Sequence, residues 1–314
     1  MPQLSTDTGF EHPALLHSTL DAFLQVMVPF VNAGLRTDEP VFVAVGAERL
    51  RALRDLVGEH DGVVWNDTLE WHPQPMPRLR AFTEYVTEQL AAGAPRLRLV
   101  GEPVWSADAP EDVREWQRYE SVLNDVLSPY PVSLVCTYDA ATLPSSIVEV
   151  AKVTHPVVRL PMEVHSAVFE PPSAFLGRWT HDLEPPPADA PRIMSPFELS
   201  AARRFLKDRA HQAGVPADRI TDLMLAANEI LTNGLVHGTG TVTLSAWTND
   251  GAFVCQIEDE GAGPEDPVAG YLPPSDETRG GRGLWIARQL VDLVQISTGP
   301  DRATVRLLMR RSAA

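Results

Sequence analysis

Cysteine, basic residues and long apolar runs are all scarce in this chain of 314 residues. Its only two cysteines, Cys136 and Cys255, each lie in a predicted strand, where a free thiol behaves as a small hydrophobe, so no structural disulfide is expected. No apolar run approaches the ~20 residues that a membrane helix needs. Residues 1–11 also lack the basic and apolar regions of a secretory signal. We therefore expect a cytoplasmic protein without a membrane segment.

The charge balance is strongly acidic, because 42 Asp and Glu outnumber 26 Lys and Arg and leave a formal net charge of -16. Nonspecific binding to nucleic acid depends on the neutralisation of phosphates by Lys and Arg. Direct nucleic-acid binding is therefore not expected. A basic protein partner would be attracted instead.

Proline is concentrated in residues 170–195, where little periodicity is visible. This composition predicts a stiff linker over residues 166–195, between a first domain at 10–165 and a second at 196–311. Directly after the prolines, Ser195-Pro196-Phe197-Glu198 has the pattern of a capping box with proline at the first helical position. The pattern predicts a helix that runs to about Ala213.

The first domain alternates helical and strand patterns. Residues 41–45, 97–100 and 132–135 are short apolar runs flanked by helical patterns, which predicts a parallel sheet covered on both faces, a doubly wound α/β domain. The loop after the first of these runs, residues 46–49, contains neither Gly-Lys-Ser nor Gly-Lys-Thr. A functional phosphate loop is therefore absent, and this domain is not expected to hydrolyse a nucleotide.

In the second domain, apolar residues recur at three and four residue steps from Ile220 to Leu235, which predicts the buried stripe of a helix. A second stripe beside it carries Glu229, Asn233 and His237 on successive turns. Amide and carboxylate oxygens are ligands that Mg²⁺ prefers, so Asn233 would hold the metal. Glu229 could accept a proton from an attacking hydroxyl. For this helix alone, an ordinary solvated face is the alternative.

A strand follows over Ala252–Asp259, where apolar residues alternate. The period of two places Asp259 on the inward face at the end of the strand. A buried carboxylate needs a partner, and the exocyclic amine of adenine is a suitable one. Gly261 and Gly263 would allow the backbone to approach the base closely. A strand that ends in an acidic turn is the alternative.

A third fragment is rich in glycine. Gly281 and Gly283 precede a helical apolar pattern that begins at Leu284. They therefore lie at a helix start, where free amides and the positive end of the dipole favour phosphate. Residues 264–279, between the second and third fragments, are rich in proline and acidic residues and could form a flap over the nucleotide.

In this order and spacing, residues from about 195 to 311 resemble the Bergerat-fold (GHKL) ATPases of the gyrase, histidine kinase and MutL superfamily. More narrowly, they resemble the anti-sigma-factor serine kinases of bacteria. The resemblance implies an α/β sandwich that uses ATP and Mg²⁺, with Glu229 as the base and Asn233 as the metal ligand. It also implies that Asp259 reads adenine with help from a late-strand threonine, matched here by Thr304. The further nucleotide-binding positions implied by the match are His237, Gly261, Gly263, Gly281, Gly283 and Leu284.

Polar side chains in the first domain fall near predicted strand ends, which is where open α/β sheets bind ligands. The region of His17, the helix with Tyr119-Glu120 and Asn124, the run from Cys136 to Asp139, and Thr154-His155-Pro156 together resemble the MEDS sensory domain. That family is regarded as a degenerate relative of RecA-type ATPases, so the resemblance implies a small-molecule signal. The candidate sensory residues are His17, Glu102, Trp105, Glu120, Tyr138, Asp139 and His155.

Each of these residues also has a purely structural interpretation. His17 could cap or pack, Trp105 could belong to the core, and His155 before proline could be a turn residue. No pair of histidines or cysteines in this domain has close ligand spacing along the chain. The spacing therefore does not predict a metal site in the first domain.

Taken together, the patterns and resemblances predict a sensor domain followed by an ATP-dependent kinase. The kinase would phosphorylate a Ser or Thr of an antagonist protein and could also sequester a sigma factor. One alternative is a sensor histidine kinase, although residues 195–215 offer a single helix before the nucleotide helix and His211 is isolated. The other is a switch that holds ATP without turnover. The sequence leaves open the signal, the protein substrate and whether the chain forms a homodimer.

Overall fold

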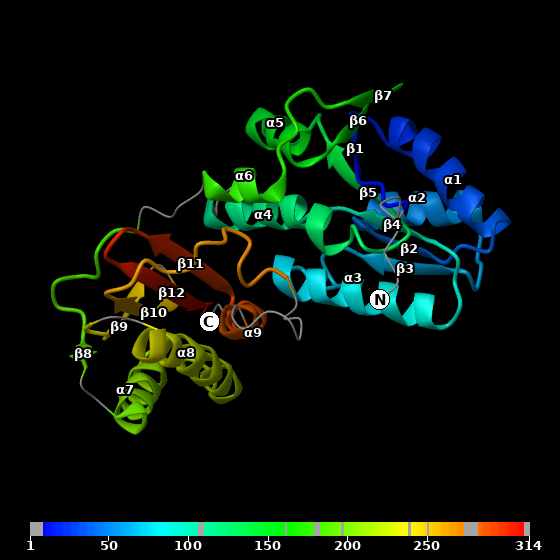
Figure 1. Cartoon of the computed structure of the whole chain (residues 1–314). Coiled ribbons are helices and arrows are strands. Elements are labelled where there is room, and N and C mark those ends of the chain that lie inside the picture. The colour runs from blue at the N-terminus through cyan, green and yellow to red at the C-terminus, as the bar shows by residue number, and fades with distance from the viewer. Residues whose placement is uncertain are drawn as a thin grey trace. The chain divides into compact units, whose positions relative to one another are not determined.

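The computed structural model describes residues 9–105, 110–160, 162–178, 183–195, 198–237, 240–249, 251–272 and 282–310. The chain forms two compact units, residues 1–175 and 176–314, which are described here one at a time (Figure 1). Among the helices that the structure describes, none combines the length and the apolar character needed to cross a bilayer.

The first unit is built on a seven-stranded sheet with the order β3-β2-β4-β5-β1-β6-β7. Neighbouring strands are parallel throughout, except that β7 lies antiparallel to β6 at one edge. The predicted apolar runs correspond to β2, β4 and β5, whereas the sequence patterns do not predict β1, β3, β6 and β7. The strands are β1 Pro13–His17, β2 Val41–Val45, β3 Val63–Asp67, β4 Leu97–Gly101, β5 Val132–Asp139, β6 Val157–Leu160 and β7 Met162–His165.

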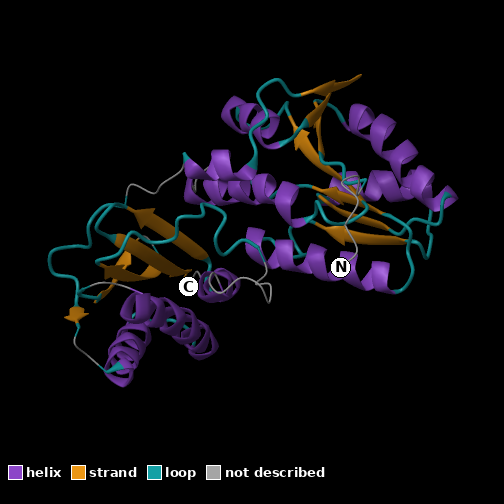
Figure 2. Cartoon of the chain, viewed as in Figure 1, coloured by secondary structure: helices purple, strands orange, loops and turns teal. Residues whose placement is uncertain are grey.

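Helices cover both faces of this sheet (Figure 2). On one face, Phe23 and Met27 of α1 pack into a core with Val43 of β2. On the other face, the ring of Phe42 lies 5.5 Å from that of Phe82 in α3. Because successive residues of a strand point to opposite faces, Phe42 and Val43 serve two different cores. The predicted doubly wound α/β fold is confirmed. The helices are α1 Leu20–Arg36, α2 Ala47–Val57, α3 Pro75–Ala91, α4 Pro110–Val126 and α5 Ser145–Thr154.

Parts of the segment predicted as a linker have regular structure. It contains α6 (Pro172–Gly177) and β8 (Arg192–Met194), and β8 pairs with β9 as the edge strand of the second sheet.

The predicted capping box is also corrected. Ser195 exchanges hydrogen bonds with Val242, whose N–H donates to the Ser195 hydroxyl at 2.9 Å. Its side chain is therefore engaged with the sheet, and the helix begins later, with Glu198 as its N-cap.

The second unit is an antiparallel five-stranded sheet, β11-β12-β10-β9-β8, with three helices packed on one face (Figure 2). The predicted apolar stripe of α8 is confirmed from Ile220 to Leu231, where Leu223 and Ile230 lie in a common core with Cys255 and Ile257 of β10, but Leu235 at its end is exposed. Burial raises the pKa of the Cys255 thiol to about 12, as suits an inert core residue. The elements are α7 Leu199–Gln212, α8 Ala217–His237, β9 Thr243–Asn249, β10 Ala252–Asp259, α9 Arg282–Leu290, β11 Leu293–Thr298 and β12 Ala303–Arg310.

An arginine near the start of α8 fixes this helix to the rest of the unit. The guanidinium of Arg219 donates to the Asp222 carboxylate at 2.8 Å, to the backbone carbonyl of Leu290 at 3.0 Å and to the Asp292 carboxylate at 2.9 Å. Leu290 ends α9 and Asp292 precedes β11. The orientation of α8, which carries the predicted site residues, is therefore set by polar contacts as well as by the apolar core.

Candidate functional site

The three predicted nucleotide fragments meet where α8, α9 and the end of β10 come together. A Cβ atom added to Gly283 would lie 2.8 Å from Nδ2 of Asn233 and 3.4 Å from Oε2 of Glu229. One built on Gly234 would lie 3.5 Å from Cβ of Asp259. The first turn of α9 thus lies against the polar stripe of α8, and α8 lies against the end of β10. Sequence reasoning missed Gly234, although a glycine inside a helix is a signal of close packing.

Glu229 and Asn233 lie one turn apart on α8, with Glu229 half-buried and Asn233 exposed. Their oxygens suit Mg²⁺, which takes few protein ligands and completes its shell with phosphate and water. The neighbouring Asn228 has a different role, because its Oδ1 accepts hydrogen bonds from Arg203 of α7 at 2.6 and 3.1 Å. The stripe is not an isolated solvated face, because Gly283 of α9 lies beside both Glu229 and Asn233, although Asn233 remains exposed.

Asp259 stands half-buried at the end of β10. The strand alternation places it on the inward face with Ile257 and Cys255, both of which lie in the core shared with the helices. Burial raises the pKa of the Asp259 carboxyl above its ordinary value of 3.8, and a backbone hydrogen bond from Gly261 opposes that shift only in part. A carboxylate in this environment has the capacity to accept a hydrogen bond from a ligand amine.

We expect Asp259→Asn to stabilise the protein at neutral pH. Because the folded-state pKa is raised, the folded chain binds more protons than the unfolded chain between the two pKa values. The free energy of unfolding therefore falls as pH rises through that interval, and the loss persists above it. Urea titrations of both proteins at several pH values would show a gain at pH 7 that shrinks towards pH 3.8. A gain that is independent of pH would contradict this account.

Thr304 is not brought to the same face as Asp259. In the ladder between β10 and β12, Thr304 lies opposite Glu258, and Ala303 lies opposite Asp259. Directly opposed residues of antiparallel strands share a face, so Thr304 is buried on the other side of the sheet. Ala303 takes the place beside the carboxylate. A shift of one residue along a strand reverses the face, and motif spacing alone could not resolve it.

The loop after β10 turns sharply across the sheet. Gly263 has a φ of +76°, and a Cβ there would lie 2.7 Å from Cγ2 of Thr298 and 3.1 Å from Cβ of Ala303. Both the backbone conformation and the close approach require glycine at this position. The close approach seen at Gly263 is to Thr298 and Ala303, and the predicted approach of its backbone to a base stays a prediction.

In the described part of the predicted flap, Gly270 and Tyr271 pack against α9. Gly270, at a φ of +80°, lies so close to α9 that a Cβ would be 2.7 Å from Cβ of Leu284. The next residue, Tyr271, is buried, and the Arg288 guanidinium lies 3.9 Å from the centre of its ring. The remainder of the predicted flap, Gly281 and the side chain of His237 lie outside the described residues.

The candidate sensory residues divide into two groups because β5 alternates. Cys136 and Tyr138 point to one face of the sheet, and Thr137 and Asp139 point to the other. On the second face, His17 lies beside Asp139 in the strand register. Residues that are close in the chain therefore belong to two separate sites.

The group on the face of Asp139 contains His17, Glu102 and Asp139. It is held together by Arg49, which sequence reasoning did not select. Its guanidinium donates to Glu102 at 2.9 Å and to Asp139 at 3.5 Å. Burial, and then the charge of Arg49, lower the pKa of His17. The backbone N–H of Gly46, the N-cap of α2, donates to Glu102 at 2.9 Å. The chain's own carboxylate thus occupies the helix start at which a phosphate loop would bind phosphate.

The other group lies on the face of Cys136 and Tyr138, and it contains Glu120, Tyr138 and His155. Oε2 of Glu120 is 3.1 Å from Nε2 of His155, and the rings of His155 and Tyr138 are 5.7 Å apart. The Trp105 ring is 5.9 Å from that of Tyr138. His12, which precedes β1, belongs to the same group, and no local pattern in the sequence marks it. Histidines that lie far apart in the chain meet here, so spacing was a poor guide to this site.

Comparison with known proteins identifies both domains. Residues 11–156 match the family model described as the MEthanogen/methylotroph, DcmR Sensory (MEDS) domain, and residues 195–309 match the histidine kinase-like ATPase domain. A protein named anti-sigma F factor from Thermoanaerobacter sp. (strain X514) is 26% identical over 114 residues, which are 34% of this chain and 80% of that protein. An anti-sigma F factor from Clostridium acetobutylicum is 26% identical over 125 residues, 37% of this chain and 85% of that protein.

Among solved structures, the RsbU and RsbW domains of a Mycobacterium tuberculosis protein align with 38% of this chain and 32% of theirs, at 21% identity and a TM-score of 0.29. Similarity at that level supports nothing further. The first match covers β1 to β5 of the doubly wound sheet, and the second covers β9 to β12 of the antiparallel sheet with α7, α8 and α9. The chain therefore consists of an N-terminal MEDS domain followed by a C-terminal histidine kinase-like ATPase domain.

Proposed function

We propose that this chain is a cytoplasmic signalling regulator whose C-terminal domain binds ATP with Mg²⁺ and phosphorylates a Ser or Thr of an antagonist protein. The observation that carries the proposal is the contact of Gly283, at the start of α9, with Glu229 and Asn233 of α8. It joins a helix start suited to phosphate with an amide and a carboxylate suited to metal binding and proton transfer. The similarity to proteins named anti-sigma F factor supports the choice of substrate class.

Each residue of the pocket has a separate part in this proposal. Asn233 holds Mg²⁺ through its amide oxygen, and Asp259 accepts a hydrogen bond from the adenine amine. The first turn of α9 offers backbone N–H groups to the phosphates, and Gly283 leaves space where a side chain would collide with Asn233. When bound, Mg²⁺ neutralises charge on the phosphates. Glu229 takes the proton from the hydroxyl of the protein substrate.

The first domain is proposed to control this activity. It matches a sensory family, and its two polar groups, one buried and one partly buried, lie on opposite faces of the sheet. A small-molecule signal can change the kinase only by as much as it binds one conformation better than another. The net charge of -16 favours a basic protein partner, which suits either an antagonist or a sigma factor that the domain would sequester.

Two other functions use the same pocket. A histidine kinase needs a phosphoacceptor hairpin of two long helices, and in the described part of the second unit only α7 precedes α8. His211 is exposed in the last turn of α7. A binding switch would hold ATP and capture its partner without phosphoryl transfer. The half-buried carboxylate of Glu229, one turn from the proposed metal ligand, favours turnover over that alternative.

Incubation of the full-length protein with γ-labelled ATP and candidate antagonist proteins distinguishes the three functions. We expect acid-stable label on a Ser or Thr of the antagonist, and no label when Mg²⁺ is chelated. Acid-labile label on the chain itself would identify a histidine kinase. An unlabelled complex that forms only with ATP would identify a binding switch. Either of these last two results would overturn the proposed kinase activity.

A further inference from the structure

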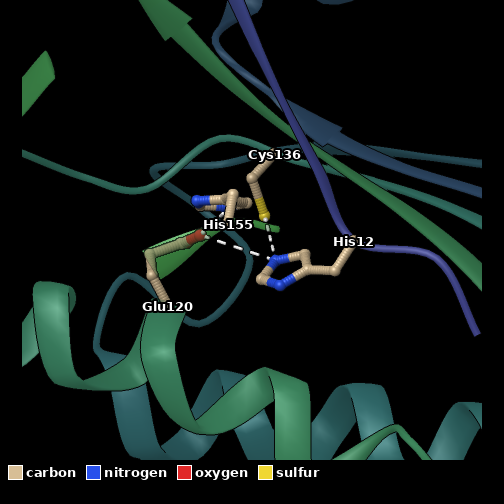
Figure 3. A group of neighbouring side chains, drawn as sticks. All are labelled: His12, Glu120, Cys136 and His155. Atoms are coloured by element: carbon tan, nitrogen blue, oxygen red, sulfur yellow. Dashed lines mark hydrogen bonds and ion pairs between the residues drawn. The ribbon is translucent and has the colours of Figure 1, made fainter. Parts of the chain in front are cut away.

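Four metal-ligating side chains form a buried cluster in the first domain (Figure 3). His12, Glu120, Cys136 and His155 are 1%, 1%, 2% and 0% exposed. One ligand atom from each lies within 4.8 Å of all the others. Figure 3 shows the four side chains turned towards one another from separate segments of the chain. The cluster belongs to the first unit, whereas the proposed nucleotide pocket belongs to the second.

The sheet topology explains why these segments meet. Strand β1 lies between β5 and β6, and Ala14 of β1 is the register partner of Cys136. His12 is two residues before Ala14 and therefore has the same orientation as Cys136. His155 is the C-cap of α5 and stands just before β6, on the other side of β1. Glu120 comes from α4.

A hydrogen-bond network determines which nitrogen of His12 faces the cluster. The side-chain amide of Asn124 donates to two backbone carbonyls, at 2.9 and 2.8 Å, which leaves its oxygen towards Nδ1 of His12 at 3.0 Å. That oxygen can only accept, so Nδ1 of His12 carries the hydrogen. The free nitrogen, Nε2, is 3.3 Å from Sγ of Cys136 and 3.8 Å from Oε2 of Glu120.

His155 is oriented in the same way. Its Nδ1 lies 2.8 Å from the backbone carbonyl of Ala151, which also can only accept, so its Nε2 faces Oε2 of Glu120 at 3.1 Å. Neither Nε2 of His155 nor either oxygen of Glu120 has a well-directed hydrogen bond among the described residues. Lone pairs of two imidazoles and a buried carboxylate therefore point at one another. The Cys136 thiol and the Tyr138 hydroxyl also interact with the Glu120 carboxylate. A cation between the carboxylate and the two imidazoles would satisfy the lone pairs that still face one another.

The donor set favours a transition metal. Imidazole nitrogen, thiolate and carboxylate are all zinc ligands, and four tetrahedral bonds of about 2.0–2.3 Å place ligand atoms about 3.3–3.6 Å apart. Three of the contacts here, at 3.1, 3.3 and 3.8 Å, bracket that spacing, and all four ligand atoms lie within 4.8 Å of one another. Calcium and magnesium prefer oxygen alone. The outer nitrogens of His12 and His155 donate to Asn124 and Ala151, which also matches the way zinc-binding histidines are held.

We propose that the N-terminal domain binds one divalent transition metal ion, zinc by its chemistry, through His12, Glu120, Cys136 and His155. The thiolate and the carboxylate together balance the charge of the ion. Because the ligands come from four segments, the metal joins the start of β1 to α4, β5 and the end of α5. Binding to the folded state alone would stabilise the domain.

The test uses the full-length chain, with Zn²⁺ and Co²⁺ as probes. We expect about one zinc per chain after gel filtration. After metal removal, Co²⁺ should give intense tetrahedral visible bands and a near-ultraviolet thiolate charge-transfer band. Cys136→Ser should abolish the charge-transfer band and weaken zinc binding at least about 10-fold. Cys255→Ser is the matched control, because this buried cysteine lies in the other domain and should leave metal binding unchanged.

The opposite result is equally clear. A folded wild-type chain that takes up no stoichiometric zinc and shows no thiolate band with Co²⁺ would overturn the proposal and leave a shared proton among Glu120 and the histidines. The wild-type cobalt spectrum decides this even if Cys136→Ser fails to fold. ATP binding measured on the same samples reports the second domain separately, so failure of the metal site and failure of the proposed kinase can be distinguished.

Discussion

Replacing Glu229 with glutamine is expected to slow phosphoryl transfer to the antagonist protein about 10²- to 10⁴-fold, because a positioned base contributes that range. ATP affinity should change little, since the amide keeps the size of the side chain. Glu229 is half-buried one turn from Asn233, and its carboxylate lies against the first turn of α9. Single-turnover transfer with enzyme in excess over ATP measures the chemical step directly.

Glu258→Gln is the matched control for this substitution. Glu258 lies on β10 next to Asp259 but points to the opposite face of the sheet, where it is paired with Thr304. Its neutralisation changes the net charge by the same amount, and it should leave the transfer rate unchanged. If Glu229→Gln transferred phosphate at the wild-type rate, positioning and metal electrostatics would carry the reaction without a protein base.

Asn233→Ala is expected to remove the Mg²⁺-dependent part of ATP affinity. Mutation of a residue that only orients a metal ligand typically lowers metal affinity about 10- to 100-fold. Loss of the ligand itself should lower the affinity by at least as much. Calorimetric titrations of ATP with Mg²⁺ and with chelator give the metal-dependent difference for each variant. Binding without the metal should survive, because Asp259 and the first turn of α9 remain.

Asn228→Ala controls for the loss of an amide from the same helix. Asn228 is bound to Arg203 of α7 and takes no part in the pocket. That variant should show the wild-type response to Mg²⁺. The assignment of Asn233 would be abandoned if its own variant kept the same ratio of affinities with and without the metal.

Burial patterns within single elements were predictable from the sequence. The three and four residue recurrence in α8 identified the buried stripe and, beside it, the stripe of Glu229 and Asn233. The alternation in β10 placed Asp259 on the helix-facing side. These predictions succeeded because each residue of a regular element is buried or exposed according to its own position in the period. The motif order likewise indicated both domain families, which the family matches confirm.

Register and strand order were decided only by the tertiary structure. The spacing of the last motif pointed to Thr304, but pairing with Glu258 places this residue on the far face and puts Ala303 beside Asp259. Edge pairing likewise turned residues of the predicted linker into β8. A displacement of one residue reverses a side chain at no cost to the local pattern, so the sequence alone does not reveal it.

In the two polar groups of the first domain, the sequence likewise predicted local features, and the tertiary structure decided which residues meet. Polar residues near the strand ends were foreseen, but alternation along β5 separates Cys136 from Asp139, and Arg49 joins only the second of them. His12 meets Cys136 and His155 because β1 enters the sheet between β5 and β6. The sequence by itself determined which faces of each element are buried, since burial acts on every residue locally. Which elements face one another was decided by strand order and register, because these depend on contacts between segments far apart in the chain.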